Sequence, residues 1–184
     1  DNLPVSEQEA KEPTSPYGLH KWTGELLANC YQRTFGVRSV QLRYFNVFGP
    51  RQDPTSPYSG VISIFADRAA RGLPLTIYGD GSQTRDFVFV SDVVEANLLA
   101  MFDERLQGPY NVGNGCETTM LELAELIQSL FGRRQNPVFA EPRAGDIRRS
   151  VADAARLRAA GWTPRVQLAE GLHRLCETSR QPAS

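Results

Sequence analysis

The sequence predicts an α/β protein. Stretches in which apolar residues recur at the spacing of amphipathic helices alternate with short apolar runs that are typical of strands. Glycines, prolines and small polar residues separate these stretches, with no internal repeat and no low-complexity tract. The 184 residues are 41% hydrophobic, which is enough for a sizeable core. The alternation of helix and strand therefore indicates the fold class.

The first predicted elements are a helix and the strand that follows it. Residues 1–16 contain prolines in a polar setting and are predicted to be an extended lead-in. Apolar residues then recur at helical spacing over 17–35, and Gly36 is a suitable C-terminal stop. These apolar residues are Leu19, Trp22, Leu26, Leu27, Cys30, Tyr31 and Phe35. A strand is predicted over 37–42.

The remaining elements continue the alternation. Residues 49–60 hold three prolines and are predicted to be a functional loop. Next come a helix over 61–71 that ends at Gly72, a strand over 75–78 and a turn at 79–81. A strand over 87–90 follows, and then a helix that runs to residue 102 and is predicted to be capped by Ser91 and Asp92. The last are a strand over 109–112, a helix over 118–131 opened by Thr118 and Thr119, a strand over 137–140, a turn around Gly145, and helices over 153–160 and 168–179.

Charge and hydropathy exclude two classes of partner. With 20 Lys and Arg against 21 Asp and Glu, the net charge is −1. The pI of about 6.2 shows no basic surplus of the kind that an electrostatic nucleic-acid binder carries. No stretch approaches the roughly 20 apolar residues of a membrane span. We therefore expect neither a nucleic-acid nor a membrane partner.

Cysteine and histidine usage predicts a reducing compartment and no structural metal. Cys30, Cys116 and Cys176 lie far apart and form no C-x-x-C pair, which suits thiols that act as small hydrophobic residues. His20 and His173 are too few for a histidine-rich metal site. The polar first residues do not form a signal peptide. These observations predict a cytoplasmic location.

Tyr17 and Lys21 have a spacing with chemical meaning. Residues four positions apart lie on one face of a helix. An ammonium near a tyrosine favours the phenolate and lowers the pKa of the phenol from about 10. Such a tyrosine can exchange a proton with an alcohol while a cofactor exchanges a hydride. An isolated Y-x-x-x-K pair is also common on helix surfaces, so its context decides between the two interpretations.

Five ordered motifs supply that context. They are SPYGLHKWTGE over 15–25, LRYFNVFGPR over 42–51, YGDGSQTRDF over 78–87, YNVG over 110–113 and RAGD over 143–146. Together they resemble the extended short-chain dehydrogenase/reductases, specifically the NAD-dependent nucleotide-sugar epimerase/dehydratase family. The resemblance covers nearly the whole chain and implies NAD as the cofactor.

The resemblance also implies roles for individual residues. Tyr17 corresponds to the catalytic acid/base, and Lys21 to the partner that also holds the nicotinamide ribose. The implied nicotinamide-bordering residues are Tyr44, Phe45 and Asn46, the last of which also contacts the sugar diphosphate. The other implied substrate-binding residues are Gly60 and Val61 over the nucleotide, Leu75, Ile77 and Tyr78 beside the uracil, Arg85 and Arg143 at the phosphates, and Asp146 at a ribose hydroxyl. Guanidinium groups suit phosphate oxygens, and a carboxylate accepts from hydroxyls.

Several of these residues have alternative structural roles. Asn46 and Asn111 could satisfy turns. Arg85 could form a local ion pair with Asp86, and Arg143 could form one with Asp146 across a turn. Tyr78 and Phe87 could be core aromatics, and Trp22 could belong to packing or to a subunit interface.

A further expectation concerns the extent of the chain. The family opens with a strand, a glycine-rich turn and a helix that bind the cofactor pyrophosphate. Neither Gly79/Gly81 nor Gly113/Gly115 fits that pattern. The chain is therefore expected to resemble the C-terminal half: the C-terminal part of a Rossmann-like domain over 1–57 and a small α/β substrate-binding region over 58–184, with interleaved Rossmann elements near 84–112. Its NAD site is expected to be incomplete, and the isolated chain inactive.

Within the family, the loop motifs are most similar to UDP-sugar 4-epimerases. These oxidise C4 through NAD, let the 4-keto sugar rotate and reduce it again. Ser150 stands where related epimerases carry a bulky aromatic or a small residue, so it predicts that UDP-N-acetylhexosamines are accepted besides UDP-glucose and UDP-galactose. A nucleotide-sugar dehydratase or decarboxylase is the alternative enzyme, and an inactive nucleotide-binding or dimerisation fragment is the alternative outside catalysis. Homodimers through the helix that bears Tyr17 are expected.

Overall fold

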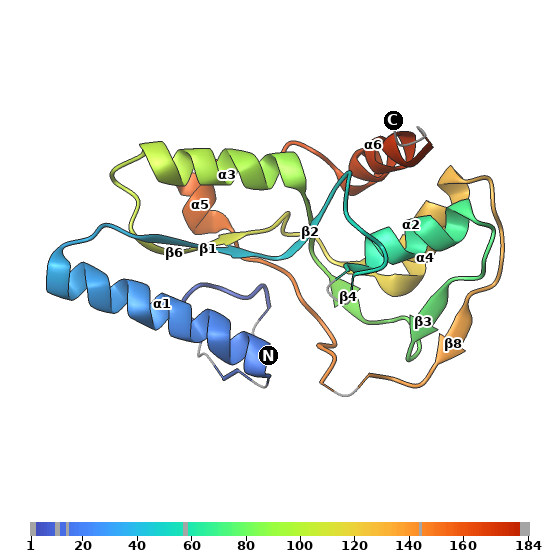
Figure 1. The fold of residues 1–184 in the computed structure, drawn as a ribbon, viewed down its shortest axis with the longest axis horizontal. Helices are drawn as coiled ribbons and strands as arrows, with labels where there is room; N and C mark the ends of the chain where they lie inside the picture. Colours follow the sequence, from blue (N-terminus) through green and yellow to red (C-terminus); the bar gives the residue numbers. More distant parts are fainter. Residues whose placement is uncertain (1–2, 10–11, 14, 57–58, 144, 181–184) are drawn as a thin grey trace.

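The computed structural model describes residues 3–9, 12–13, 15–56, 59–143 and 145–180 (Figure 1). Its helices are α1 (Pro16–Phe35), α2 (Val61–Ala70), α3 (Val90–Phe102), α4 (Met120–Leu130), α5 (Ala155–Ala159) and α6 (Leu168–Arg180). Its strands are β1 (Val40–Tyr44), β2 (Asn46–Phe48), β3 (Thr76–Tyr78), β4 (Thr84–Arg85), β5 (Phe87–Phe89), β6 (Gly108–Val112), β7 (Thr118–Thr119) and β8 (Val138–Ala140). The α/β prediction is confirmed.

Helix α1 begins and ends where the sequence predicts. The hydroxyl of Ser15 accepts a hydrogen bond from the amide of Gly18, and Pro16 occupies the first helical turn, where a missing N–H costs nothing. Gly36 ends the helix in the left-handed conformation at φ 68°, and its amide donates to the carbonyl of Gln32. A capped start and a glycine stop therefore fix the register of this helix.

The predicted cap of α3 is wrong, whereas that of α4 is confirmed. β5 runs directly into α3, so Ser91 and Asp92 lie inside the helix and Phe89 precedes it without a side-chain cap. Asp92 is buried instead, and its carboxylate accepts from the amide of Val166. At α4, Thr119 and Glu122 form a reciprocal capping box.

The segment 40–48 pairs with two different strands in succession. β1 pairs in parallel with β6, and β2 pairs in parallel with β5. Between them the amide of Phe45 donates to the carbonyl of Val112, and the amide of Asn46 donates to the carbonyl of Asp86, each at 3.0 Å. One extended segment thus leaves one partner and joins another. Ligands of open α/β sheets bind where strand order changes.

The other strand pairs lie away from this switch. β3 pairs in parallel with β8, and β4 pairs antiparallel with β7. No strand was expected from sequence at β2, β4 or β7, which are two or three residues long. Such short strands show no period, because their position is decided by pairing and not by local pattern.

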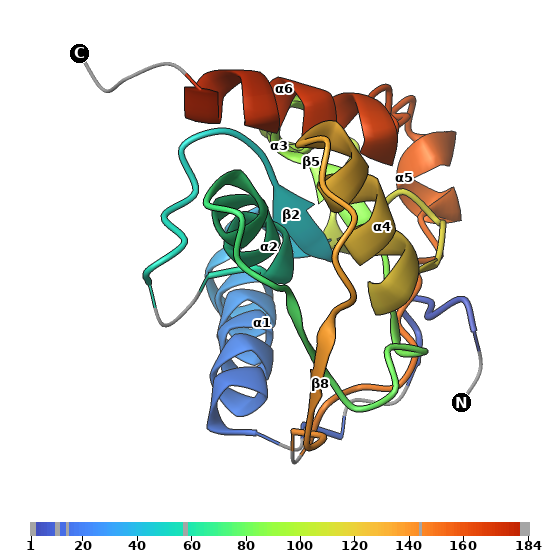
Figure 2. The same ribbon diagram turned by 90° about the vertical axis from the view of Figure 1, so that its right-hand side faces the viewer.

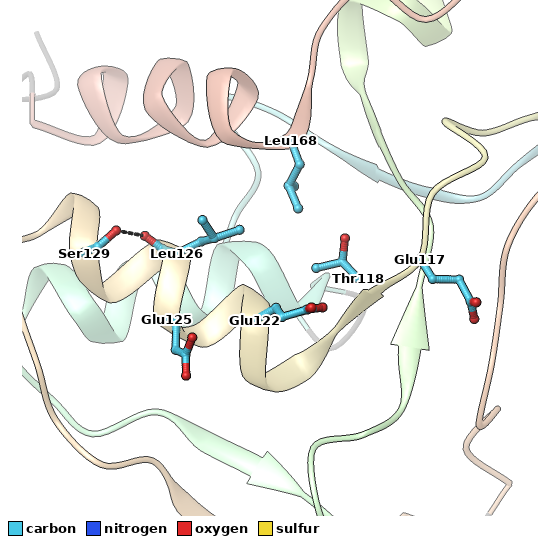
Figure 3. A pocket seen from close by; sticks show the side chains of 7 residues that line it. All are labelled: Glu117, Thr118, Glu122, Glu125, Leu126, Ser129 and Leu168. Carbon is cyan, nitrogen blue, oxygen red and sulfur yellow. Dashed lines mark hydrogen bonds between the residues drawn. The ribbon is translucent and has the colours of Figure 1, made fainter.

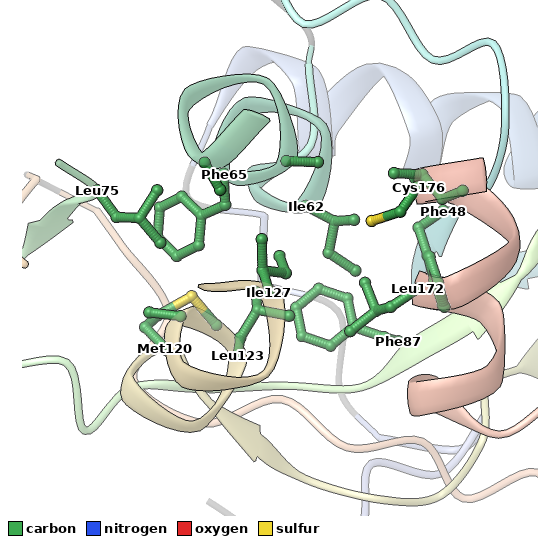
Figure 4. Close-up of a cluster of buried hydrophobic side chains, with 14 of the residues drawn as sticks. Phe48, Ile62, Phe65, Leu75, Phe87, Met120, Leu123, Ile127, Leu172 and Cys176 are labelled. Atoms are coloured by element: carbon green, nitrogen blue, oxygen red, sulfur yellow. The ribbon is translucent and has the colours of Figure 1, made fainter. Parts of the chain in front are cut away.

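The apolar residues form two clusters. One joins α2, α4 and α6 and contains Ile62, Leu123 and Leu172 among its buried members (Figure 4). The other joins β1 and β6 to α3 and α5 and contains Val112 and Leu157. Figure 2 shows α6 crossing above α2 and α4. The division predicted between residues 57 and 58 falls on residues outside the described ranges.

Helix α1 leaves most of its apolar side chains exposed. None of its residues is buried, and only Trp22 of the predicted apolar set is half-buried. The helix lies on the opposite side of β1 and β6 from α3 (Figure 1) and is attached by the ion pair of Glu25 with Arg43 at 2.5 Å. In the part of the chain that the structure describes, no helix is long and apolar enough to cross a membrane.

Candidate functional site

The predicted Tyr–Lys pair lies in the first turns of α1. The ammonium of Lys21 lies 5.4 Å from the centre of the Tyr17 ring. Tyr17 is 66% exposed, so its hydroxyl is open to a ligand. Both views place this end of α1 beside the segment that follows β8 (Figures 1 and 2). The helix therefore presents both groups together, as the spacing predicts.

Tyr44, Phe45 and Asn46 occupy the point at which the strand changes partners. The hydroxyl of Tyr44 donates to the Asn97 side-chain oxygen at 2.8 Å. The main chains of Phe45 and Asn46 are held by Val112 and by Asp86. These contacts fix the backbone of the three residues at the ends of β1 and β6.

A second group of predicted residues meets at a pocket of about 660 Å³. The guanidinium of Arg143 lies 3.8 Å from the centre of the Tyr78 ring. Arg85 forms an ion pair with Asp146, which lines the same pocket. The residues that line the pocket are Tyr78, Gly79, Asp80, Ser82, Gln83, Phe139, Ala140, Glu141, Pro142, Arg143, Asp146, Ile147 and Arg148. Tyr78, Arg143 and Asp146 thus line one pocket, and Arg85 is joined to it through its ion pair with Asp146.

These contacts show whether the two ion pairs considered from sequence are formed. Arg85 pairs with Asp146 and not with its neighbour Asp86, whose side chain is fully buried. Arg143 stacks on Tyr78, and Asp146 donates its amide to the carbonyl of Arg143. Both local ion pairs considered from sequence, Arg85 with Asp86 and Arg143 with Asp146, are therefore wrong.

Of the three residues predicted beside the uracil, only Tyr78 reaches the pocket. Leu75 and Ile77 are each 1% exposed and belong to the apolar core. A side-chain contact of Leu75 or Ile77 with a ligand is thus excluded in this structure. Phe87 is a core aromatic, and the buried Asn111 donates to the carbonyls of Val5 and Asp153.

Gly60 and Val61 lie at the N-terminal end of α2, which begins at Val61. Gly60 precedes the helix, and a Cβ added there would lie 3.1 Å from the side-chain nitrogen of Gln52. The carbonyl of Gly60 accepts from the hydroxyl of Ser63. Ser150 is half-buried in the segment between β8 and α5, two residues before the buried Ala152. None of these residues lines the pocket around Arg143.

Two carboxylates near the site were not singled out from sequence. Asp86 accepts hydrogen bonds from the amides of Asn114, Gly115 and Ala152 at 2.8–2.9 Å. Burial raises the pKa of its carboxyl group, although these three bonds oppose the shift. Glu117 pairs with Arg149, and this pair together with the Thr84 hydroxyl lowers the pKa of Glu117 to about 2. For Asp86, the Arg-Asp-Phe sequence in which it stands is the signal that could have identified it from sequence.

A pocket of about 560 Å³ beside α4 has acidic walls (Figure 3). Glu122 caps α4 through Thr119, and Glu117 points away from the other side chains toward its partner Arg149. These two carboxylates therefore serve the fold. Among the described residues, no group of His, Cys, Asp and Glu is arranged to hold a metal ion.

Parallel strands packed against helices, together with a Tyr–Lys pair in the first turns of α1, define a Rossmann-like α/β protein. The sequence profile of the "NAD dependent epimerase/dehydratase family" matches residues 2–113. The chain belongs to this family.

Curated relatives support the same assignment. A protein of Methanocaldococcus jannaschii named "Putative UDP-glucose 4-epimerase" is 42% identical over 173 residues, which are 94% of this chain and 56% of that protein. UDP-glucuronic acid decarboxylase 1 of Arabidopsis thaliana is 38% identical over 167 residues, or 90% of this chain and 38% of that protein. The chain spans about half the length of the epimerase relative.

Solved structures agree closely with the fold. UDP-glucose 4-epimerase of Thermotoga maritima, solved with UDP-glucose, is 41% identical with a TM-score of 0.93, covering 98% of this chain and 58% of that one. UDP-N-acetylglucosamine 4-epimerase of Methanobrevibacter ruminantium, solved with UDP-N-acetylmuramic acid, is 36% identical with a TM-score of 0.92, covering 97% and 57%.

Proposed function

We propose that the chain is the nucleotide-sugar-binding part of an NAD-dependent UDP-sugar 4-epimerase. The observation that carries the proposal is the pocket at which Tyr78, Arg143 and the Arg85–Asp146 pair meet. Two guanidinium groups suit the oxygens of a diphosphate, and the carboxylate of Asp146 suits ribose hydroxyls. The similarity to proteins named as UDP-sugar 4-epimerases supports uridine as the nucleoside.

In this proposal, Tyr17 handles the proton of the sugar 4-hydroxyl. Its exposed hydroxyl can receive that proton when C4 is oxidised and return it when the 4-keto sugar is reduced on its other face. The ammonium of Lys21 lies beside the ring, 5.4 Å from its centre. NAD, when bound, supplies hydride transfer at C4. The exposed Tyr17 and Lys21 and the fixed backbone of Tyr44, Phe45 and Asn46 fit one side of a nicotinamide ribose site.

The proposal extends to the sugar and to assembly. The small side chain of Ser150 leaves room for a 2-acetamido group, so we include UDP-N-acetylglucosamine and UDP-N-acetylgalactosamine with UDP-glucose and UDP-galactose. The exposed apolar side chains of α1 support a homodimer through this helix. The widely spaced Cys30 and Cys116, both exposed, suit the cytoplasm.

A calorimetric titration of the chain with UDP, TDP and GDP tests the nucleotide. We expect UDP to bind and the other two to bind at least tenfold more weakly. Equal affinity for all three, or no binding of UDP, contradicts the proposed site.

The decarboxylase relative supports a second candidate reaction, in which the same site takes UDP-glucuronic acid. The two reactions give different products: an epimerase interconverts C4 epimers, whereas a decarboxylase releases carbon dioxide. Incubating the whole enzyme, of which the chain is proposed to be a part, with NAD and each nucleotide sugar, followed by product chromatography, separates them. A protein that binds UDP and turns over neither substrate fits the non-catalytic alternative.

A further inference from the structure

We propose that Glu117 is a positioning residue, which through Arg149 fixes the segment 146–152 that carries Asp146 and Ser150. The role of that segment in holding a nucleotide sugar rests on the proposed function. The geometry by which Glu117 holds the segment does not.

Glu117 joins three parts of the chain. Its Oε1 and Oε2 accept from Nε and Nη2 of Arg149 at 3.0 and 2.6 Å, which is a two-pronged, charge-assisted contact. The hydroxyl of Thr84 donates to the same Oε1 at 2.6 Å. Thr84 belongs to β4 and Glu117 directly precedes β7, so the carboxylate ties this strand pair to Arg149.

The rest of the segment is attached on either side of Arg149. The amide of Thr84 donates to the carbonyl of Arg148, and Arg85 donates to the carbonyl of Ile147. Further along, the amide of Ala152 donates to the buried carboxylate of Asp86 at 2.9 Å. Ser150 lies between the Arg149 and Ala152 attachments, so its position depends on both.

The exposure of the Glu117–Arg149 pair indicates that it orders the segment 146–152 and does not stabilise the whole fold. The side chains of Arg149 and Glu117 are 56% and 27% exposed. A pair this accessible to water contributes little to the free energy of unfolding. The low pKa of Glu117, caused by Arg149 and by Thr84, keeps the carboxylate ionised near neutral pH. Its effect is therefore expected in the order of the segment more than in the stability of the fold.

The variant Glu117→Gln tests the proposal, and Asp103→Asn is the matched control. Asp103 also forms a two-pronged pair with an arginine, Arg105, and has a pKa lowered to about 2, but it lies at the end of α3. Hydrogen exchange reports on the amides of Thr84 and Ala152, which bond to the segment or belong to it. We expect exchange at least fivefold faster in Glu117→Gln and unchanged in Asp103→Asn, with only a small shift in the midpoint of urea unfolding for either variant.

A titration with UDP adds the functional measurement. We expect the affinity of Glu117→Gln for UDP to fall about fivefold and that of Asp103→Asn to stay as in the wild type. Unchanged exchange in Glu117→Gln overturns the proposal, and so does faster exchange with unchanged UDP affinity. If the wild type does not bind UDP, the proposed function fails, and the exchange rates alone then decide whether Glu117 fixes the segment.

Discussion

Gly113 lies against the carboxylate of Asp86. A Cβ added at position 113 would lie 2.8 Å from Oδ2 of Asp86 and 2.5 Å from the Cβ of Ala152. Both distances are too short for real contacts. The close approach lets the Asp86 carboxylate reach the amides that follow Gly113 and, on the other side, the amide of Ala152. The residues that follow β6 and the segment that precedes α5 are thus held together by the Asp86 side chain, at a position where only a glycine leaves enough space.

The first prediction follows from this contact. Gly113→Ala should lower the free energy of unfolding by about 1–3 kcal/mol, because the added methyl group overpacks a buried site. Gly24→Ala is the control: no atom lies within 4 Å of the added Cβ, and alanine inside a helix is about 0.5–1 kcal/mol more favourable than glycine. Urea unfolding should move in opposite directions for the two variants. A neutral or stabilising Gly113→Ala contradicts the contact.

The second prediction concerns the pH dependence of stability. Because the pKa of Glu117 is about 2 in the fold and 4.5 ordinarily, its contribution is complete above pH 4.5 and is lost as the pH falls to about 2. The small difference in unfolding free energy between the wild type and Glu117→Gln should therefore be constant from pH 7 to 5 and shrink below pH 4.5. Urea unfolding at half-unit steps measures it. A difference that grows as the pH falls would have the wrong sign.

The third prediction is self-association through α1. The exposed side chains of this helix include Leu19, Leu26, Leu27, Tyr31 and Phe35. Leu27→Glu should weaken association at least tenfold in equilibrium sedimentation, since it places a charge in the apolar surface. Leu73→Glu, at an exposed leucine outside α1, should leave it unchanged. A wild-type chain that stays monomeric rules out this interface.

Local sequence signals predicted the long elements well. The extent of α1 was predicted from its apolar spacing and from the glycine at 36, although the helix starts at Pro16, which was assigned to the lead-in. The error at Ser91 and Asp92 arose because a cap-forming residue type says nothing of whether a strand enters the helix directly. The change of strand partner at Phe45 depends on residues more than forty positions away, and so no local pattern indicates it.

The sequence motifs indicated which residues to consider for the candidate site, but not which of their side chains contact one another. The motifs selected Tyr78, Arg143 and Asp146, which line one pocket, and Arg85, which forms an ion pair with Asp146. Sequence neighbours suggested the wrong ion pairs, because the direction in which each side chain points depends on tertiary packing. Glu117 carried no motif signal, since its partner Arg149 lies 32 positions away.

The fourth prediction tests the phosphate-binding role of Arg143. Arg143→Ala should weaken UDP binding by about tenfold to a hundredfold, because a hydrogen bond to a charged group contributes roughly 1.5–3 kcal/mol. Arg105→Ala removes a guanidinium at the end of α3 and should leave the affinity unchanged. Calorimetry with UDP and with uridine separates the phosphates from the base: uridine affinity should change less than UDP affinity. An equal loss for both ligands would assign Arg143 to the stacked Tyr78 ring and not to phosphate.

The fifth prediction concerns the sugar. A tyrosine at position 150 would replace the half-buried hydroxymethyl group of serine with a bulky ring, in the segment between Arg149 and Ala152. Ser150→Tyr should therefore lower the affinity for UDP-N-acetylglucosamine at least tenfold while changing that for UDP-glucose by less than threefold, since one buried steric conflict costs about 1–3 kcal/mol. Ser150→Ala, which keeps the site small, should retain both. Competition titrations against UDP measure the two affinities in one protein. An equal fall for both sugars in Ser150→Tyr would mean that position 150 supports the pocket as a whole and does not select the 2-acetamido group.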